Sequence, residues 1–239
     1  YQFPRSHTAK LDEHNAVQRR TFTRWINVQL EKLDMAIGDL DDLRDGVRLI
    51  ALLVVLTGEK LTPERGRMRL HRLENVRTVL AFLERRQVKM VNIRPEDIVD
   101  GNEKLTLSLV WFIISHFYLR QKDALLQWAR EAIHECPTRL GIEIKDFTNS
   151  WRDGAAFKGI ISRYRPDLVY GVLAAEASAR ENLEKAFTAA EAGGVARLIE
   201  PEDVDCDSPD ERSIITYVAS LYRAFQKQPQ SEIAQQNGD

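Results

Sequence analysis

The sequence predicts an all-α protein of two tandem domains, each a bundle of about four main helices. Landmarks recur in the same order at offsets of 103 to 108 residues: Trp25 and Trp128, Asp45 and Asp153, Asn75 and Asn182, and PEDI from Pro95 with PEDV from Pro201. Apolar residues in both copies repeat at helical spacing. The 239 residues, 44% of them hydrophobic, suffice for two cores of about 110 residues, close to the commonest domain size.

The opening helix of the first copy is predicted over AVQRRTFTRWINVQLEKL, residues 16–33. Its spacing places one apolar set on a single side: Phe22, Trp25, Ile26, Leu30 and Leu33. Arg20, Arg24 and Asn27 fall on the opposite side, which is expected to meet solvent or a partner. Trp25 and its counterpart Trp128 are expected to be core anchors.

An Arg-Asp-Gly triplet precedes the second helix of each copy. Asp45 and Asp153 stand where a helix begins, so each carboxylate can accept bonds from the first free N–H groups. Gly46 and Gly154 leave room at the crowded helix start. The buried helices VRLIALLVVLTG and AAFKGIISRYRPDL then follow, the first ending at Gly58 and the second before Pro166.

A third and a last helix complete each copy. The third is predicted over LENVRTVLAFLERR and ARENLEKAFTAAEA, with Asn75 and Asn182 near its start. The last is predicted over KLTLSLVWFIISHFYL and DERSIITYVASLYRAF, and Ser208 with Glu211 forms a capping-box pattern before the second of these. Pro95 and Pro201 each introduce a short turn, and no segment predicts a sheet.

Composition narrows the function classes. Residues 1–120 hold 20 Lys and Arg against 16 Asp and Glu, a charge of +4, whereas residues 121–239 hold 14 against 20, a charge of −6. A charge of +4 is too small for the basic stripe of a nucleic-acid binder, so no nucleic-acid partner is expected. No apolar stretch reaches the roughly 18 residues of a membrane span, and no secretory leader is recognised. A soluble protein of the cytoplasm is expected.

The sequence contains few residues in patterns typical of metal sites, disulfides or catalytic sites. Cys136 and Cys206 lie 70 residues apart without partners at zinc-ligand spacing. Phosphate-binding glycine loops, zinc-protease motifs and nucleophile elbows are absent from the sequence. The acidic group Asp39, Asp41, Asp42 and Asp45 lacks the spacing of a calcium-binding EF-hand loop. The protein is therefore expected to be noncatalytic, with no cofactor and no metal.

Several strings together resemble a known family: DLRDG, WRDG, GRMRLHRLENV, VNIRPEDIVDGNEKLTLSLVW, RYRPDLV and SPDERSIITYVASLYRAF. They are similar to the tandem calponin-homology actin-binding region of the spectrin and α-actinin superfamily, and most like the plakins, which include plectin and the spectraplakins. The resemblance covers about residues 14–227. It implies an N-terminal tail over 1–13, a first calponin-homology domain over 14–119, a second over 120–227, and a C-terminal tail or linker start over 228–239.

This resemblance implies binding to the side of filamentous actin, as the N-terminal region of a larger cytoskeletal linker. The first domain would supply most of the contact, and the second would stabilise the complex or restrain access. Three segments of the family carry the contact. They match the polar side of the opening helix, with Gln18, Arg19, Arg20, Thr21, Thr23, Arg24 and Asn27; the last helix of the first domain, with Lys104, Leu105 and Ser108; and the opening helix of the second domain, with Lys122, Leu126 and Arg130.

Alternatives remain open at each of these sites. From the residues alone, the arginines of the opening helix fit an ordinary solvated face equally well. The dense cluster Arg65, Arg67, Arg69, Arg72 and Arg77 suits actin, an anionic phosphoinositide or a regulatory protein, or else pairs internally with Glu64 and Glu74. A scaffold for regulatory or membrane-proximal partners, with weak or no actin binding, is the main rival function. Microtubule binding is disfavoured by the tandem arrangement.

The join between the two domains departs from the family pattern. Members of the family usually have a flexible connector there, yet SHFYL runs into RQKDALLQW with almost nothing between. Either the connector is absent or its residues are missing from this sequence, and we favour the second interpretation.

Overall fold

The computed structural model describes residues 7–119, 121–136, 141–168 and 178–226, and the secondary structure within these ranges is helical throughout. The first domain contains α1 (His7–Leu30), α2 (Val47–Thr57), α3 (Arg69–Arg85), α4 (Pro95–Val99) and α5 (Glu103–Ile113). The second contains α6 (Lys122–His134), α7 (Ala155–Tyr164), α8 (Ala179–Ala192), α9 (Pro201–Val204) and α10 (Glu211–Gln226). The predicted all-α fold, with four long helices in each copy, is confirmed.

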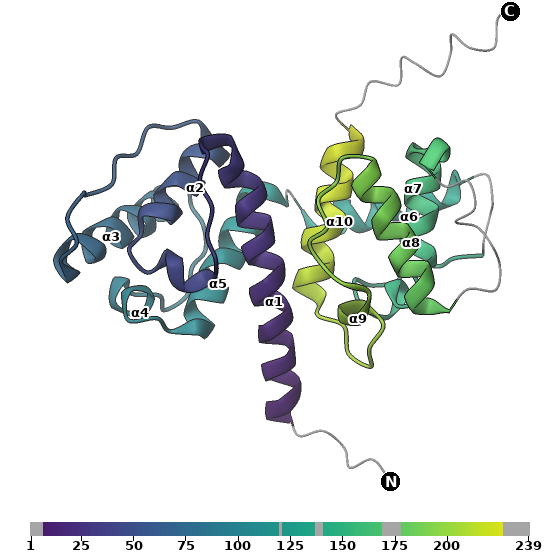
Figure 1. Cartoon of the computed structure of the whole chain (residues 1–239), viewed down its shortest axis with the longest axis horizontal. Coiled ribbons are helices and arrows are strands. Elements are labelled where there is room, and N and C mark those ends of the chain that lie inside the picture. The colour runs from purple at the N-terminus through teal and green to yellow at the C-terminus, as the bar shows by residue number, and fades with distance from the viewer. Residues whose placement is uncertain (1–6, 120, 137–140, 169–177, 227–239) are drawn as a thin grey trace, which may run out of the picture.

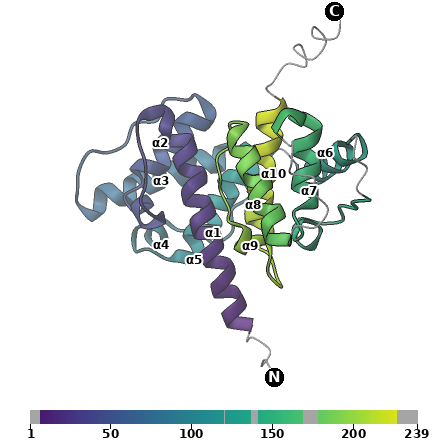
Figure 2. The ribbon, with the colours of Figure 1, turned by 45° about the vertical axis from the view of Figure 1, so that its right-hand side comes forward.

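The two domains lie side by side with α1 between them (Figure 1). Helix α1 packs on α2 and α5 of its own domain and on α10 of the other. Figure 2 again shows α1 at the boundary between the two domains, beside helices of the second domain. One helix therefore serves both the core of the first domain and its contact with the second.

The apolar side of α1 is buried as predicted. Phe22, Trp25, Ile26 and Leu30 have no exposed surface, and Trp128 is 8% exposed. Leu33 is an exception, because α1 ends at Leu30 and a short 3₁₀ turn over Glu31–Leu33 leaves the Leu33 side chain 42% exposed. Its assignment to the core was wrong because the helical spacing does not continue through that turn.

Several element boundaries differ from the sequence prediction. Helix α1 begins at His7, inside the range expected to be an N-terminal tail, and α3 begins at Arg69, ahead of Leu73. The last helix of the first domain changes at Ile114 into a five-residue π-helix that ends at Tyr118. The two PED turns are short helices that start with proline, α4 and α9.

Asp210, and not Ser208, caps α10. Its carboxylate accepts hydrogen bonds from the backbone N–H of Ser213 at 2.9 Å and from the Ser213 hydroxyl at 2.7 Å. The capping box predicted for Ser208 was wrong because an aspartate two residues later stands directly before the first helical residue.

The duplicated Arg-Asp-Gly triplet performs the same structural role in both domains. Asp45 accepts from the Val47 N–H, and Asp153 accepts from the Ala155 N–H, each at 2.9 Å. Gly46 and Gly154 adopt φ of +76° and +75°. A side chain at Gly46 would approach the Asn75 Cβ to 2.6 Å, and one at Gly154 would approach the Leu183 nitrogen to 2.8 Å. Each glycine thus allows α3 or α8 to pass directly over the helix start.

Replacing Asp45 or Asp153 by alanine should lower the thermal stability of the domain concerned. Each substitution removes one hydrogen bond to a helix start, at a cost of about 1 kcal/mol. Filament binding at low temperature should change little, since both carboxylates act within their own domains. Thermal melts beside filament cosedimentation would check this, and a large loss of binding with unchanged melting would identify the triplet as a contact site instead.

Candidate functional site

The polar side of α1 faces the second domain. The Gln18 carboxamide, which is buried, donates to Asp210 at 2.7 Å. Arg20 forms an ion pair with Asp203, and Arg24 pairs with Glu200 at 2.7 Å. The sequence predicted that solvent or a partner would cover this side, and in the structure it is covered by another part of the same chain.

His14 extends this contact toward the start of α1. Its Nε2 atom lies 2.7 Å from the Ser208 carbonyl oxygen, and its Nδ1 atom lies 4.0 Å from the Asp210 carboxylate. Four side chains along α1 therefore reach the segment from Glu200 to Asp210, just ahead of α10. We call this set, His14, Gln18, Arg20 and Arg24, the basic face of α1.

Three other predicted residues of α1 hold the first domain together. Arg19 donates to Asp39 and Glu103, each at 2.9 Å, and to Asp41 at 3.1 Å. The hydrogen bonds to Asp39 and Glu103 raise the pKa of Arg19 above its ordinary value. Thr21 is fully buried, and the Asn27 carboxamide makes two bonds with the Ile37 backbone, at 2.8 and 3.0 Å. Thr23 is half-buried and remains a candidate for contact.

The second predicted segment, in α5, presents a short exposed strip. Lys104 is exposed, while Leu105 and Ser108 are half-buried. The Ser108 hydroxyl donates to the Lys104 carbonyl at 2.9 Å, and no ion pair involves Lys104 within the described ranges. The rest of α5 is mainly core, as expected: Thr106, Leu107, Leu109, Val110 and Ile113 are buried. Lys104 is thus an exposed cation on a helix that is otherwise mostly buried.

The third predicted segment, in α6, carries cations that are already engaged. Lys122 is exposed and pairs with Glu211 of α10 at 2.6 Å. Arg130 donates to the Ile144 carbonyl at 2.7 Å, and Leu126 is half-buried. These bonds lie within the second domain.

Aromatic side chains of the first domain lie at the boundary with the second domain. Tyr118, at the end of the π-helix, meets Trp25 edge to face at 5.3 Å between ring centroids. Its hydroxyl lies 3.2 Å from the Ser220 hydroxyl, and the Arg223 guanidinium lies 4.5 Å from its ring centroid. Burial raises the pKa of Tyr118. A second cation–π contact crosses the boundary where Arg212 lies over the Trp111 ring, at 5.4 Å.

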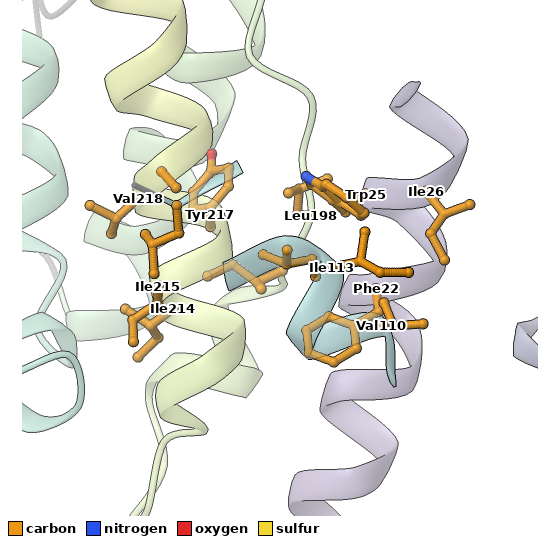
Figure 3. Close-up of a cluster of buried hydrophobic side chains, with 14 of the residues drawn as sticks. Phe22, Trp25, Ile26, Val110, Ile113, Leu198, Ile214, Ile215, Tyr217 and Val218 are labelled. Carbon is orange, nitrogen blue, oxygen red and sulfur yellow. The ribbon is translucent and has the colours of Figure 1, made fainter. Parts of the chain in front are cut away.

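Apolar side chains from both domains continue the contact. Figure 3 shows Leu198 of the second domain beside the Trp25 ring, with Phe22 and Ile113 of the first domain nearby. A crevice of about 290 Å³ is lined by Trp25, Leu198 and Arg223, among others. Aromatic rings of the first domain thus meet Leu198, Arg212 and Arg223 of the second domain, and the ion pairs of α1 lie beside this contact.

The arginine cluster of the first domain is only partly neutralised. Arg69 pairs with Asp100 at 2.9 Å, and Arg77 pairs with Glu74 at 3.4 Å. Arg65, Arg67 and Arg72 are exposed and have no ion pair in the part of the chain that is described. Of the internal pairs that the alternative interpretation offered, the described residues show one with Glu74 and none with Glu64.

Sequence reasoning missed the partners of α1 in the second domain. Glu200, Asp203 and Asp210 belong to the acidic segment EPEDVDCDSPDE, which was interpreted only as a turn and a cap. The opposite charges of the two halves were the available signal. Pairing a basic helix with an acidic segment about 180 residues away, however, requires knowledge of how the domains pack.

Comparisons with known proteins agree with this architecture. The family model described as calponin homology (CH) domain matches residues 16–118 and 119–227. The actin-crosslinking core of Schizosaccharomyces pombe fimbrin superposes with a TM-score of 0.70 at 22% identity, over 87% of this chain and 48% of that one. At that identity the likeness concerns the fold.

Two sequence relatives of higher identity are much longer proteins. Microtubule-actin cross-linking factor 1 of Rattus norvegicus is 50% identical over 232 residues, which cover 92% of this chain and 4% of the relative. The human non-erythrocytic spectrin beta chain 4 is 48% identical over 236 residues, covering 92% of this chain and 9% of the relative. The chain therefore spans less than a tenth of these relatives. With two family matches that together span nearly its whole length, the chain belongs to the calponin homology domain family.

Proposed function

We propose that this chain binds filamentous actin, as the actin-binding region of a larger cytoskeletal linker in the cytoplasm. The relatives that it resembles at 48 to 50% identity include a protein named as a microtubule-actin cross-linking factor. The chain supplies exposed or displaceable cations on α1, α5 and α6, the three segments expected to contact the filament. Its role is noncatalytic, and it requires no cofactor.

The observation that carries the proposal is the pairing of Arg20 and Arg24 with acidic groups of the second domain. An acidic filament surface would offer these cations the same kind of partner as Asp203 and Glu200 do. The second domain and the filament then compete for the basic face of α1. Lys104 on α5 stays accessible while the domains are closed, so it can make a first contact before α1 is released.

Through this competition the second domain restrains access of the filament to α1. Binding through the basic face requires the two domains to separate, and the apparent affinity falls with the fraction of molecules that are open. The contacts to be broken include ion pairs, cation–π contacts and the apolar contact of Leu198 with Trp25. The Arg24 and Glu200 side chains are 37% and 33% exposed, so that ion pair is individually weak. Arg20 instead meets a carboxylate of Asp203 that is 7% exposed, so opening must also return this group to water.

Filament cosedimentation of the whole chain should be sensitive to salt, and the first domain should dominate it. Charged contacts at a surface weaken as the Debye length falls to about 8 Å near 0.15 M salt. Lys104→Glu should reduce binding more than Lys122→Glu, because Lys122 is held by Glu211. Equal losses from both variants would contradict the dominance of the first domain, and absence of pelleting at low salt would reject actin as the partner.

That last outcome would favour the rival function, a scaffold for regulatory or membrane-proximal partners. The observation that supports such a partner is the exposure of Arg65, Arg67 and Arg72, which have no ion pair within the described ranges. A phosphoinositide or an acidic regulatory protein would suit these cations. No helix in the described part of the chain has the length and apolarity to span a bilayer.

A further inference from the structure

A basic and apolar surface lies at the outer edge of the first domain. Residues 65–72, RGRMRLHR, form the end of the segment before α3 and the first turn of that helix. Met68 and Leu70 are 65% and 62% exposed, among the most exposed large apolar side chains described. Exposed arginines surround them. We call this surface the arginine edge; it comprises Arg65, Arg67, Met68, Arg69, Leu70 and Arg72.

The arginine edge keeps a surplus of positive charge. Only Arg69 has an ion pair, with Asp100, among its four arginines in the described structure. Three guanidinium groups therefore have no counter-ion among the residues described. A solvated surface normally mixes both signs of charge, and here two apolar side chains separate charges of one sign.

The backbone beneath the arginine edge is fixed. The Asn75 carboxamide accepts from the Glu64 N–H at 2.7 Å and donates to the Glu64 and Asp45 carbonyls at 3.3 and 3.0 Å. Gly66 lies so close to the His71 ring that any side chain there would overlap it. Asn75 thus holds the backbone at Glu64, and Gly66 lies against His71, while the side chains of Arg65 and Arg67 are exposed.

The internal duplication shows that the fold does not require this surface. With Asn75 aligned to Asn182, residues 65–72 correspond to 172–179, which read VLAAEASA and contain no Lys or Arg. Residues 172–177 lie outside the described residues, so this comparison concerns the sequence alone. The second copy also matches the calponin homology model, and basic residues at this point of the sequence are therefore not a general requirement of the domain.

The position of the arginine edge separates it from the basic face of α1. The segment leading into α3 lies at the end of the first domain that points away from the second domain (Figures 1 and 2). Domain closure leaves this end open, so a ligand can bind there in both closed and separated arrangements.

We propose that the arginine edge docks on the surface of an anionic lipid bilayer. Three unpaired arginines complement lipid head groups, and each basic residue near such a surface strengthens binding about fivefold. Met68 and Leu70 then enter the boundary between head groups and acyl chains, where their exposed apolar area is removed from water. A soluble anion would engage the arginines alone, whereas a bilayer uses both kinds of side chain.

Vesicle cosedimentation of the whole chain tests this proposal. The chain should bind vesicles that contain phosphatidylserine, bind phosphatidylcholine vesicles far less, and lose binding as salt rises. R65Q/R67Q/R72Q should weaken binding roughly a hundredfold, from three contributions of about fivefold. M68S/L70S, which leaves every charge in place, should weaken it about tenfold. The charge-matched control R85Q/K89Q/K185Q removes three exposed cations elsewhere and should bind nearly like the parent.

Three other results would contradict the proposal that the arginine edge docks on a bilayer. If M68S/L70S binds like the parent and inorganic phosphate displaces the vesicles, the site is one for soluble anions. If the matched control loses as much as the arginine variant, general charge explains the binding. If both edge variants bind vesicles like the parent and instead lose cosedimentation with filaments, the edge is a filament contact and not a bilayer contact. Circular dichroism and thermal melts of all variants show whether each is folded, and Arg65 and Arg67, which precede α3, can be tested as a milder pair.

Discussion

Reversing the charges of Arg20 and Arg24 to glutamate should reduce filament affinity roughly a hundredfold or more. Two cations that face an acidic filament become two like charges, and such juxtapositions cost several kcal/mol. The first domain should lose little stability, typically within about 0.5 kcal/mol at each exposed site, since Phe22, Trp25 and Ile26 on the opposite side are untouched. Cosedimentation over a range of filament concentrations measures the change.

The structure adds a second consequence to this variant. Glutamates at both positions would face Asp203 and Glu200, so the domains should also separate. Separation alone is expected to favour binding, and a loss of affinity would therefore be due to the basic face itself. Circular dichroism and a thermal melt must accompany the assay. A folded double variant that pellets like the parent would remove α1 from the filament contact and leave Lys104 and its neighbours.

Changing the other side of the same pairs should have the opposite effect. In E200K/D203N the cations of α1 remain, while their partners become a lysine and a neutral amide. The closed arrangement loses two ion pairs and gains repulsion between Arg24 and the ammonium group introduced at position 200, so a larger fraction of molecules is open. Filament affinity should rise about tenfold, corresponding to roughly 1.4 kcal/mol. Asparagine is used at position 203 because its amide oxygen can still accept from the backbone N–H of residue 200, which keeps this half of the capping box of α9 although E200K removes the half that the Glu200 side chain supplies.

A matched control comes from the neighbouring acidic residues. E202K/D205N makes the same change in charge in the same segment, but Glu202 pairs with Arg180 inside the second domain. This control should bind filaments much as the parent does. If it raises affinity equally, the general charge of the second domain explains the gain. If E200K/D203N binds no better than the parent, the second domain does not restrain access.

The helices could be predicted from the sequence because the signals that define them are local. The spacing of Phe22, Trp25 and Ile26 depends only on the geometry of one helix, and Gly46 and Gly154 each mark a helix start. Local signals also explain the errors. Leu33 fits the spacing of α1 but follows its last turn, and Ser208 fits a capping pattern that Asp210 takes over.

The candidate site was predicted less completely because its residues act across domains. The resemblance identified the segment that contains Arg20, but neither spacing nor composition shows that Asp203 lies against it. Arg19 illustrates the same limit, since three bonds to Asp39, Asp41 and Glu103 make it a structural residue on a helix whose other arginines are directed to the second domain. Neighbouring arginines on one helix thus have different roles, and these roles can be told apart only from how the helix packs in the structure.

The join between Tyr118 and Lys122 makes the second domain a tethered competitor. In the given sequence three residues separate the end of the π-helix from the start of α6, and a flexible connector of the length usual in the family would tether the domains in the same way. A short tether keeps the acidic segment near α1 at an effective concentration of about millimolar or more, independent of how much protein is present. Weak contacts are then enough to hold the domains together. Dilution therefore does not release the basic face of α1. A filament has to displace the acidic segment of the second domain, which stays covalently attached.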